Sequence, residues 1–167
     1  MEYILREWRE TDLDSLIKFA NNANNTKWMS KDWRYPYTVD DGKKFLARFT
    51  NRTPPIKLFA IEIKGEAVGG IGFFPDNDIH KKNADLYFWL DEVYTGKGIM
   101  TKAVKEILEY GFKTFDTFKV YGKTFSTNIK AQAVLERAGF KLEAKYERAC
   151  FKNGEFYDEF IFSKFKE

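Results

Sequence analysis

The sequence has too few cysteine and histidine residues to support several classes of function. It contains one cysteine, Cys150, and one histidine, His80. A single cysteine cannot form an internal disulfide, and the two residues together are too few for a Cys/His zinc site. We therefore expect no metal, and a reducing, cytoplasmic setting.

Long apolar runs and a strong charge bias are also missing. No stretch approaches the roughly 20 apolar residues that span a bilayer. The opening MEYILREWRE lacks the apolar core of a signal peptide. The 28 Lys and Arg against 25 Asp and Glu leave a net charge of only +3, whereas nucleic-acid binders concentrate basic residues on one face. We expect a soluble protein with neither a membrane nor a nucleic-acid partner.

Aromatic residues, in contrast, are abundant. The 167 residues include 4 Trp, 9 Tyr and 17 Phe, whereas disordered chains are poor in such residues. The length suits one domain with a sizeable core, and there is no internal repeat or linker-like stretch. The prediction is a single domain over residues 1–167.

Apolar periodicity predicts an α/β domain with a mixed, largely antiparallel sheet. We expect helices following Thr11 and Thr38 and at 99–112 and 128–138, and strands at 4–8, 57–63, 67–74, 85–90 and 118–123. Residues 21–30 read as a loop. Two final strands flank Asn153-Gly154, a dipeptide typical of hairpin turns. The predicted order is β-α-α-β-β-β-α-β-α-β-β.

The most informative stretch is DLYFWLDEVYTGKGIMTKAVKEILEYGF, residues 85–112. A buried strand enters a turn with two glycines, and the turn opens a long helix. The N-terminus of a helix has about half a positive charge and presents unpaired N–H groups, which suit a diphosphate. Glycine has no Cβ and lets the backbone approach phosphate oxygens. The candidate ligands are the amides of Gly96, Gly98, Ile99, Met100 and Thr101, with Lys97 and Lys102 adding charge.

The glycine turn alone is weak evidence. A turn that merely connects a strand to a helix has the same pattern. The P-loop pattern and the third glycine of a dinucleotide fingerprint are both absent from this segment.

Four segments together resemble one family. TGKGIMTKAV after FWLDEVY resembles the acetyl-CoA motif Q/R-x-x-G-x-G/A of the GNAT N-acetyltransferases. TNIKAQAVLERAGFKLE, residues 127–143, is similar to their N-x-x-S…-x-G-F segment. The opening LREWRETDLDSL and the ending ERACFKNGEFYDEFIFSKF resemble the branch that includes the RimJ and RimL protein N-terminal acetyltransferases. The segments occur in the family's order and cover nearly the whole chain.

The resemblance implies a GNAT fold and transfer of the acetyl group of acetyl-CoA to a primary amine, such as a protein N-terminus. It implies that the strand edge at Phe88, Trp89 and Leu90 pairs with the pantetheine arm, where this strand splays from residues 118–123. Residues 96–101 would bind the pyrophosphate. Asn128 would approach the pantetheine or thioester end, and Lys130 the adenine side.

Three positions depart from the family's pattern. Val93 stands where many members have Gln or Arg, and Ala131 where many have Ser. Leu135 stands where other members have a Tyr that reprotonates the departing thiolate. The resemblance therefore does not identify the proton donor.

The proton acceptor is sought among carboxylates of the central strands, where the resembling enzymes often place one. The amine must lose a proton before it attacks, since a Lys-like amine has a pKa near 10.4. Asp85 begins the strand assigned to pantetheine and is the preferred catalytic base. Glu62, in FAIEIK, and His80 are the alternatives, and an exposed structural role is open for each.

Other features leave alternatives open. Trp28, Trp33, Tyr35 and Tyr37 are either core packing or an aromatic wall of the acceptor site. Cys150 is more typical of a small buried hydrophobe than of a nucleophile. Polyamines or aminoglycosides compete with peptide N-termini as acceptors, and a monomer or a homodimer is equally compatible. Rival functions are a CoA-binding module without catalysis and an interaction domain whose glycine turn is only structural.

Overall fold

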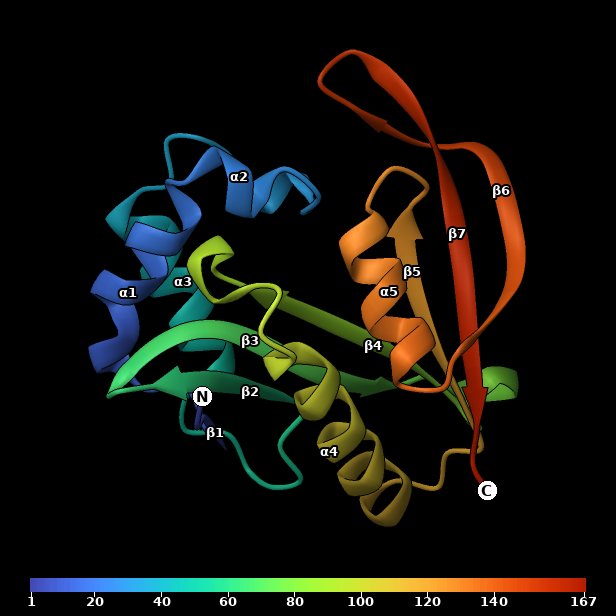
Figure 1. Ribbon diagram of the computed structural model, residues 1–167. Coiled ribbons are helices and arrows are strands. Elements are labelled where there is room, and N and C mark those ends of the chain that lie inside the picture. The colour runs from blue at the N-terminus through green and yellow to red at the C-terminus, as the bar shows by residue number, and fades with distance from the viewer. The chain divides into compact units, whose positions relative to one another are not determined.

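The computed structural model describes all 167 residues. The chain divides into two compact units: Met1–Gly72 with Phe88–Ile99, and Phe73–Tyr87 with Met100–Glu167. The seven strands form a mixed sheet in the order β1-β2-β3-β4-β5-β7-β6 (Figure 1). The predicted α/β class with a largely antiparallel sheet is confirmed.

Three strands of the first unit form an antiparallel meander. β1 (Ile4–Arg6) pairs with β2 (Leu58–Ile63), with Ile4 opposite Glu62. β2 pairs with β3 (Glu66–Pro75) across a turn in which both Lys64 and Gly65 have positive φ. That geometry matches the right-handed twist of the two strands, so the hairpin predicted here is confirmed.

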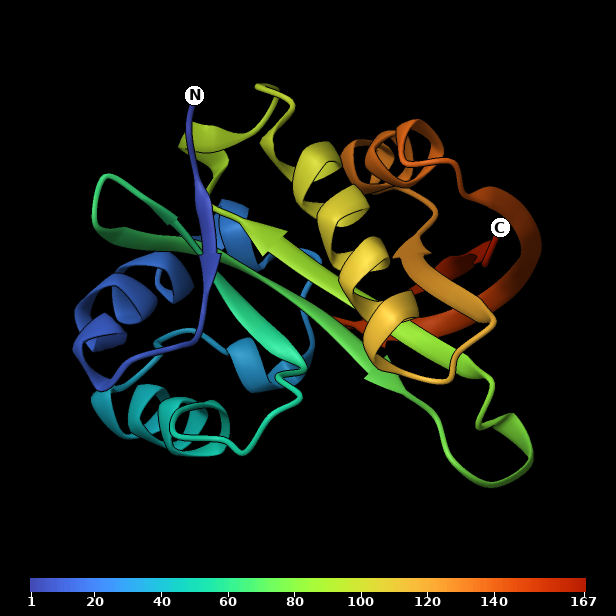
Figure 2. The same ribbon diagram turned by 90° about the horizontal axis from the view of Figure 1, so that it is seen from below.

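The helices of the first unit are α1 (Leu13–Ala20), α2 (Ala23–Thr26) and α3 (Val39–Phe49), with short 3-10 turns η1 (Glu10–Asp12) and η2 (Lys31–Trp33). Thr38 and Asp41 form the predicted capping box at the start of α3. α1 and α3 lie side by side (Figure 2). They approach closely because Gly42 has no side chain, and a Cβ there would lie 2.7 Å from Leu13 Cδ1.

The strands of the second unit include a parallel pair. β4 (Asn83–Leu90) pairs in parallel with β5 (Lys119–Phe125), and β5 pairs antiparallel with β7 (Glu155–Phe165). β6 (Lys141–Lys152) and β7 form the predicted hairpin, in which Asn153 and Gly154 both have positive φ.

Two helices belong largely to the second unit. α4 (Ile99–Thr114) buries Ala103, Val104, Ile107 and Leu108 at helical spacing. α5 (Ile129–Arg137) follows β5 and lies beside it (Figure 1). No helix of the structure combines the length and apolarity that a membrane crossing needs.

The element order agrees with the sequence prediction except in one segment. Residues 21–30 are not simply a loop, because they contain the four-residue helix α2. Its cap is Asn22, whose side chain accepts a hydrogen bond from the Asn24 amide at 3.0 Å. The 3-10 turns η3 (Asp78–His80) and η4 (Glu92–Tyr94) complete the chain.

Candidate active site

The turn between β4 and α4 has the geometry that a phosphate-binding loop needs. Gly96 and Gly98 have φ values of +74° and +76°, a conformation that L side chains rarely adopt. A Cβ built at either glycine would meet nothing within 4 Å. Glycine is therefore required here by the backbone conformation, and the space in front of both residues is open.

Backbone donors of this turn are available to a ligand. None of the amides of Gly96, Lys97 and Gly98 donates to a backbone acceptor of the chain. The first N–H groups of α4 add to them, because the opening turn of a helix has no intrahelical acceptors. Open space, unpaired amides and the positive end of a 16-residue helix fit the pyrophosphate of acetyl-CoA.

The side chain of Lys97 is directed at its own turn. Its ammonium donates to the Val93 carbonyl at 2.7 Å and lies 5.5 Å from the ring centroid of Tyr94. The backbone amides, rather than this ammonium, are therefore the main candidate phosphate ligands.

Two asparagines of the segment around α2 fix the turn that precedes these amides. Asn22 Nδ2 donates to the Glu92 carboxylate at 2.7 Å, and the Glu92 amide donates to Asn25 Oδ1 at 2.8 Å. The Glu92 carbonyl in turn accepts from the amide and hydroxyl of Thr95. The asparagine-rich stretch is thus a clamp on the turn, a role that its composition alone did not indicate.

The pairing of β4 with β5 ends before β4 does, and the assignment of the end of β4 to pantetheine stays a prediction. The ladder between β4 and β5 stops at Leu86 opposite Gly122, although β4 continues to Leu90. The side chain of Trp89 packs toward β3, where a Cβ on Gly70 would lie 2.3 Å from its ring. The Trp89 ring is half-buried against β3, and its backbone is the part that the resemblance assigns to a ligand.

The aromatic residues before α3 belong mainly to the core of the first unit. The Trp33 ring lies 5.3 Å from Trp89, 5.5 Å from Phe45 and 5.6 Å from Tyr37 between centroids. Tyr37 is buried, whereas Tyr35 is 75% exposed. Core packing accounts for Trp33 and Tyr37, and leaves only Tyr35 as a clearly exposed ring.

Asn128 is the N-cap of α5. Its side-chain oxygen accepts from the Ala131 amide at 3.3 Å. Gln132 supports the same loop, because its Nε2 donates to the carbonyls of Phe125 and Ser126 at 3.1 and 2.9 Å. The capping role was expected from the sequence, and a contact of Asn128 with pantetheine stays a prediction.

Replacing Asn128 with Asp separates these two roles. Either side chain caps a helix well, so Asn128→Asp should leave the melting temperature nearly unchanged. The substitution removes an amide donor and adds negative charge at the thioester end, so we expect kcat to fall about tenfold. Steady-state kinetics beside thermal denaturation test this. Unchanged turnover would reduce Asn128 to a structural cap.

Asp85 lines a polar cavity of the second unit. The cavity has a volume of about 440 Å³ and is bounded by η3 and strands β4 to β7. Asp85 Oδ1 lies 2.9 Å from Lys123 Nζ. The cavity lining includes His80, this lysine and the carboxylates of Asp76, Asp85, Glu143 and Glu159. The Glu143 carboxylate is also paired with Lys119 Nζ at 2.6 Å.

The pKa values of Lys123 and Tyr87 are shifted by burial and by the carboxylate of Asp85. Burial alone would lower the pKa of Lys123, but its hydrogen bond and charge attraction to Asp85 outweigh that effect and raise the pKa. The pKa of Tyr87 is raised by burial and, further, by Asp85. Lys123 is therefore held as an ammonium that neutralises part of the Asp85 charge, and Tyr87 as a neutral phenol beside the same carboxylate.

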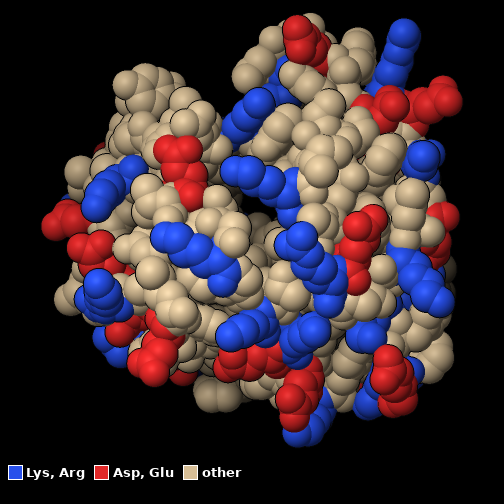
Figure 3. All heavy atoms as spheres, viewed as in Figure 1, with Lys and Arg blue, Asp and Glu red and all other residues tan.

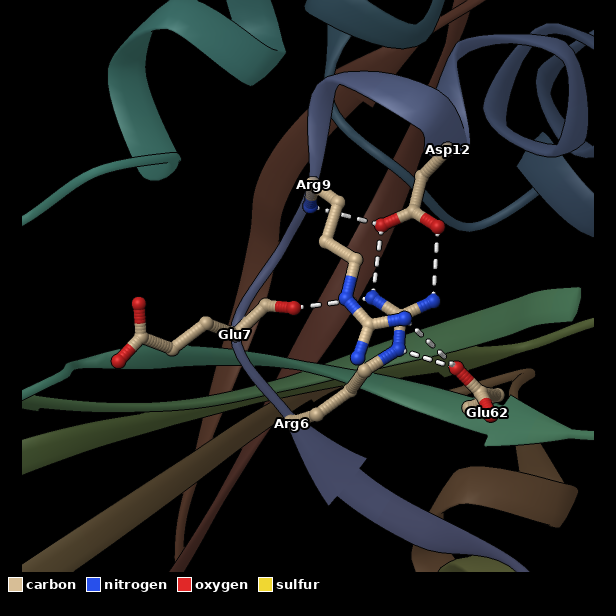
Figure 4. A network of polar contacts seen from close by, with 5 residues as sticks. All are labelled: Arg6, Glu7, Arg9, Asp12 and Glu62. Carbon is tan, nitrogen blue, oxygen red and sulfur yellow. Dashed lines mark hydrogen bonds and ion pairs between the residues drawn. The ribbon is translucent and has the colours of Figure 1, made fainter. Parts of the chain in front are cut away.

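Glu62, the alternative base, is engaged elsewhere. It pairs with Arg6 Nε, and Arg6 also binds both oxygens of Asp12 at 2.7 and 2.8 Å (Figure 4). Arg9 Nη1 lies 3.7 Å from the same Glu62 oxygen. Glu62 thus joins β1, η1 and β2 in a network of largely buried charges.

A Glu62→Gln variant should accordingly lose stability rather than activity. Removing one charged partner from a largely buried pair costs about 1–3 kcal/mol. We expect a lower denaturation midpoint with kcat within about twofold of the parent. A large fall in kcat at full stability would instead identify Glu62 as the base.

Cys150 does not form a nucleophilic pair. Its Sγ lies 3.8 Å from Glu159 Oε1, and burial, followed by this carboxylate, raises the pKa of the thiol. The reactive thiolate is therefore disfavoured. His80 lies on an exposed turn at the edge of the Asp85 cavity.

A second, larger cavity of the second unit includes none of the predicted site residues. It measures about 720 Å³ and lies between the later part of α4, the end of α5 and the last residues of β7. Its lining includes the basic residues Lys105, Lys113, Arg137, Lys164 and Lys166. Two acidic residues, Glu109 and Glu167, also line it and pair with Lys113 and Lys164. On the face that Figure 3 shows, acidic side chains lie among the basic ones.

This chain is similar to known acetyltransferases. Residues 3–141 match the family model described as the acetyltransferase (GNAT) domain. The spermidine N(1)-acetyltransferase of Escherichia coli K12 is 30% identical over 152 residues, which cover 91% of this chain and 80% of that protein. The ribosomal-protein-serine acetyltransferase of the same strain is 24% identical over 147 residues, covering 85% and 82%.

A solved structure extends the likeness to the whole fold. The microcin C7 self-immunity acetyltransferase MccE, in complex with acetyl-CoA and AMP, matches with a TM-score of 0.83 and 27% identity. The match covers 99% of this chain and 93% of that chain.

Proposed function

This chain belongs to the GNAT acetyltransferase domain family, and we propose that it acetylates a primary amine of a small polycationic acceptor, such as a polyamine. Dependence on acetyl-CoA and N-acetyl transfer follow from the family. The choice of acceptor rests on the cavity around Asp85, which is lined by four carboxylates and one lysine, with Glu143 also paired to Lys119 at 2.6 Å. Cations of a polyamine would replace water at these carboxylates.

The proposed donor site is the backbone of the turn and strand described above. The amides of Gly96, Gly98, Ile99, Met100 and Thr101 would hold the pyrophosphate, and the edge at Phe88, Trp89 and Leu90 would pair with pantetheine. A backbone N–H near Trp89 or Leu90 would stabilise the tetrahedral oxyanion. Much of the acceleration would come from holding both reactants in place.

The proposed acceptor chemistry begins at Asp85. An ammonium group must be deprotonated before its nitrogen can attack the thioester. Asp85 would take that proton, directly or through water. Lys123, 2.9 Å away, keeps the carboxylate oriented and would yield its place to the ammonium of the acceptor.

A protein N-terminus is the second candidate acceptor. The resemblance to the RimJ and RimL branch supports it, as does the 24% identity with the ribosomal-protein-serine acetyltransferase. The spermidine enzyme is more similar, at 30% identity, and the carboxylate-lined cavity favours a polycation over a single α-amine.

We also propose that residues 1–167 act as one domain, in a reducing compartment such as the cytoplasm.

An acceptor panel distinguishes the two candidates. Spermidine, spermine, an aminoglycoside and N-terminal peptides are compared by kcat/KM, with free thiol as the readout. We expect a kcat/KM for a polyamine about 100-fold above that for any peptide. A neutral amine of similar size is the matched control, since it should not benefit from the carboxylates. A peptide as the best acceptor would overturn the polyamine proposal while leaving acetyl transfer intact.

A further inference from the structure

The hydroxyl of Thr124 on β5 is buried without a partner. Thr124 is 7% exposed, and its Oγ1 is inaccessible to solvent and makes no hydrogen bond. An unpaired buried polar group destabilises a fold, because it loses its hydrogen bonds to water without gaining others. A fold that retains such a group usually supplies a water or a ligand for it.

Thr124 faces the helix α5. Side chains two residues apart on a strand point to the same side, so Thr124 shares the face of Gly122. A Cβ on Gly122 would lie 2.6 Å from Leu135 Cδ2, which places α5 directly over this face. Thr124 is about 7 Å farther along β5, toward the end of the strand.

The early part of α5 lies over that end of β5. Gln132 Nε2 donates to the carbonyl of Phe125, the last residue of the strand. Ala131 lies one helical turn before Leu135 and therefore on the same side of α5. Thr124 thus lies on the face of β5 that α5 covers, toward the early part of that helix.

Ala131 and Leu135 are the positions at which the resemblance to the family implies Ser and Tyr. Both replacements are apolar, and Leu135 is fully buried. This part of α5 therefore has no side-chain hydroxyl for a leaving thiolate at either position. The strand opposite supplies one.

We propose that Thr124 is the hydrogen-bond donor to the sulfur of acetyl-CoA and relays the proton to the leaving thiolate. This inference rests on the proposed donor site, in which Asn128 marks the thioester end. The Thr124 hydroxyl would then find at the sulfur the partner that it lacks within the chain.

The neutral amine forms the C–N bond, and the tetrahedral intermediate breaks its C–S bond with the electron pair moving to sulfur. The Thr124 hydroxyl gives its proton to sulfur and regains one that the acetylated nitrogen loses. Of the two protons that an ammonium loses on becoming an amide, one therefore ends on CoA and the other leaves through the base.

Two substitutions test whether the hydroxyl matters. Thr124→Val keeps the shape of the side chain and removes the donor, and we expect kcat to fall about 100-fold with little change in KM for acetyl-CoA. Thr124→Ser should retain most of the activity.

Thr117 is the matched control, because it is 3% exposed and its Oγ1 also lacks a partner. Thr117→Val should leave kcat unchanged, and equal losses in both valine variants would refute the proposal.

Two readouts separate a role at sulfur from a role in packing. Thr124→Val should raise the pKa of the enzyme-bound CoA thiol, followed by thiolate absorbance, because it removes a donor to the thiolate. The second substitution Ala131→Ser restores a hydroxyl on the opposite helix and should recover at least tenfold of the lost kcat. An unchanged thiol pKa together with no rescue would contradict the proposal.

A disulfide trap tests the contact directly. In a Cys150→Ala background, Thr124→Cys should form a mixed disulfide with CoA under mild oxidation, seen as the mass of one added CoA. Thr117→Cys is the control and should not react. A titration of the parent with CoA is run alongside. If the parent does not bind CoA, the proposed donor site fails; if it binds and Thr124→Cys forms no disulfide, the inference about Thr124 alone fails.

Discussion

Gly98→Val should weaken acetyl-CoA binding about 100-fold, which corresponds to about 2.7 kcal/mol. Gly98 has a φ of +76°, and the space in front of its Cα is open. A valine would put two methyl groups where the pyrophosphate must approach, and would move the amide of residue 98 away from its left-handed conformation. Isothermal titration with acetyl-CoA measures the loss.

Gly65→Val is the matched control for Gly98→Val. Gly65 has a φ of +85° in the turn between β2 and β3, and a Cβ there also meets nothing within 4 Å. Both variants should lose a similar amount of stability, about 1–2 kcal/mol from backbone strain. Only Gly98→Val should lose the ligand. Equal acetyl-CoA affinity in the two folded variants would show that the glycine turn is only structural.

Asp85→Asn should lower kcat by a factor of 100 or more, within the range that general bases contribute. The amide cannot accept the proton of the ammonium, whereas the affinity for acetyl-CoA should change little. The loss should shrink as the pH rises toward 10, because a growing fraction of the acceptor amine is then neutral without help. Profiles of log(kcat/KM) against pH for parent and variant measure this convergence.

Asp76→Asn and Lys123→Met are the control variants for Asp85→Asn. Asp76 lines the same cavity and lies on the exposed loop before η3, so its loss should change KM for the acceptor more than kcat. Lys123→Met removes the ion pair at 2.9 Å but leaves the Asp85 carboxylate in place. A loss in Asp85→Asn that does not vary with pH, or no loss at all, would move the role of base to His80 or to solvent.

The glycine turn between β4 and α4 could be predicted from sequence because it is local. Its strand, its two glycines and its helix are consecutive, and the positive φ of Gly96 and Gly98 follows a pattern that short-range sterics dictate. The capping roles of Thr38 and Asn128 were accessible for the same reason. In each case the interacting atoms lie within a few residues of one another.

Long-range pairing could not be read from sequence. Glu62 and Asp85 look alike as strand carboxylates, and only the fold assigns Glu62 to Arg6 and Asp85 to Lys123. The clamp of Asn22 and Asn25 on Glu92 spans about 70 positions, so the asparagine-rich stretch could only be described as polar. The unpaired hydroxyl of Thr124 likewise emerges only when β5 and α5 are packed.

The side of the sheet that each residue faces also depended on tertiary structure. The backbone of Trp89 was expected to pair with a ligand, which stays a prediction, and the sequence did not indicate that its ring stacks on Trp8 at 6.2 Å between centroids. Gly70 permits this, because any side chain there would collide with the indole. Such a close approach of strand and ring is set by distant residues, and alternation along β4 alone does not specify it.

The central claim is that this chain moves an acetyl group from acetyl-CoA to an amine, and one measurement tests it most directly. Purified protein is incubated with acetyl-CoA and spermidine, and free CoA thiol and acetylated amine are quantified in the same samples by thiol titration and mass spectrometry. The account predicts that both products appear in a one-to-one ratio, at a rate that Gly98→Val and Asp85→Asn each reduce about 100-fold or more. If acetyl-CoA binds to the protein but neither spermidine nor any other amine releases thiol, the chain is a CoA-binding module and the account is contradicted.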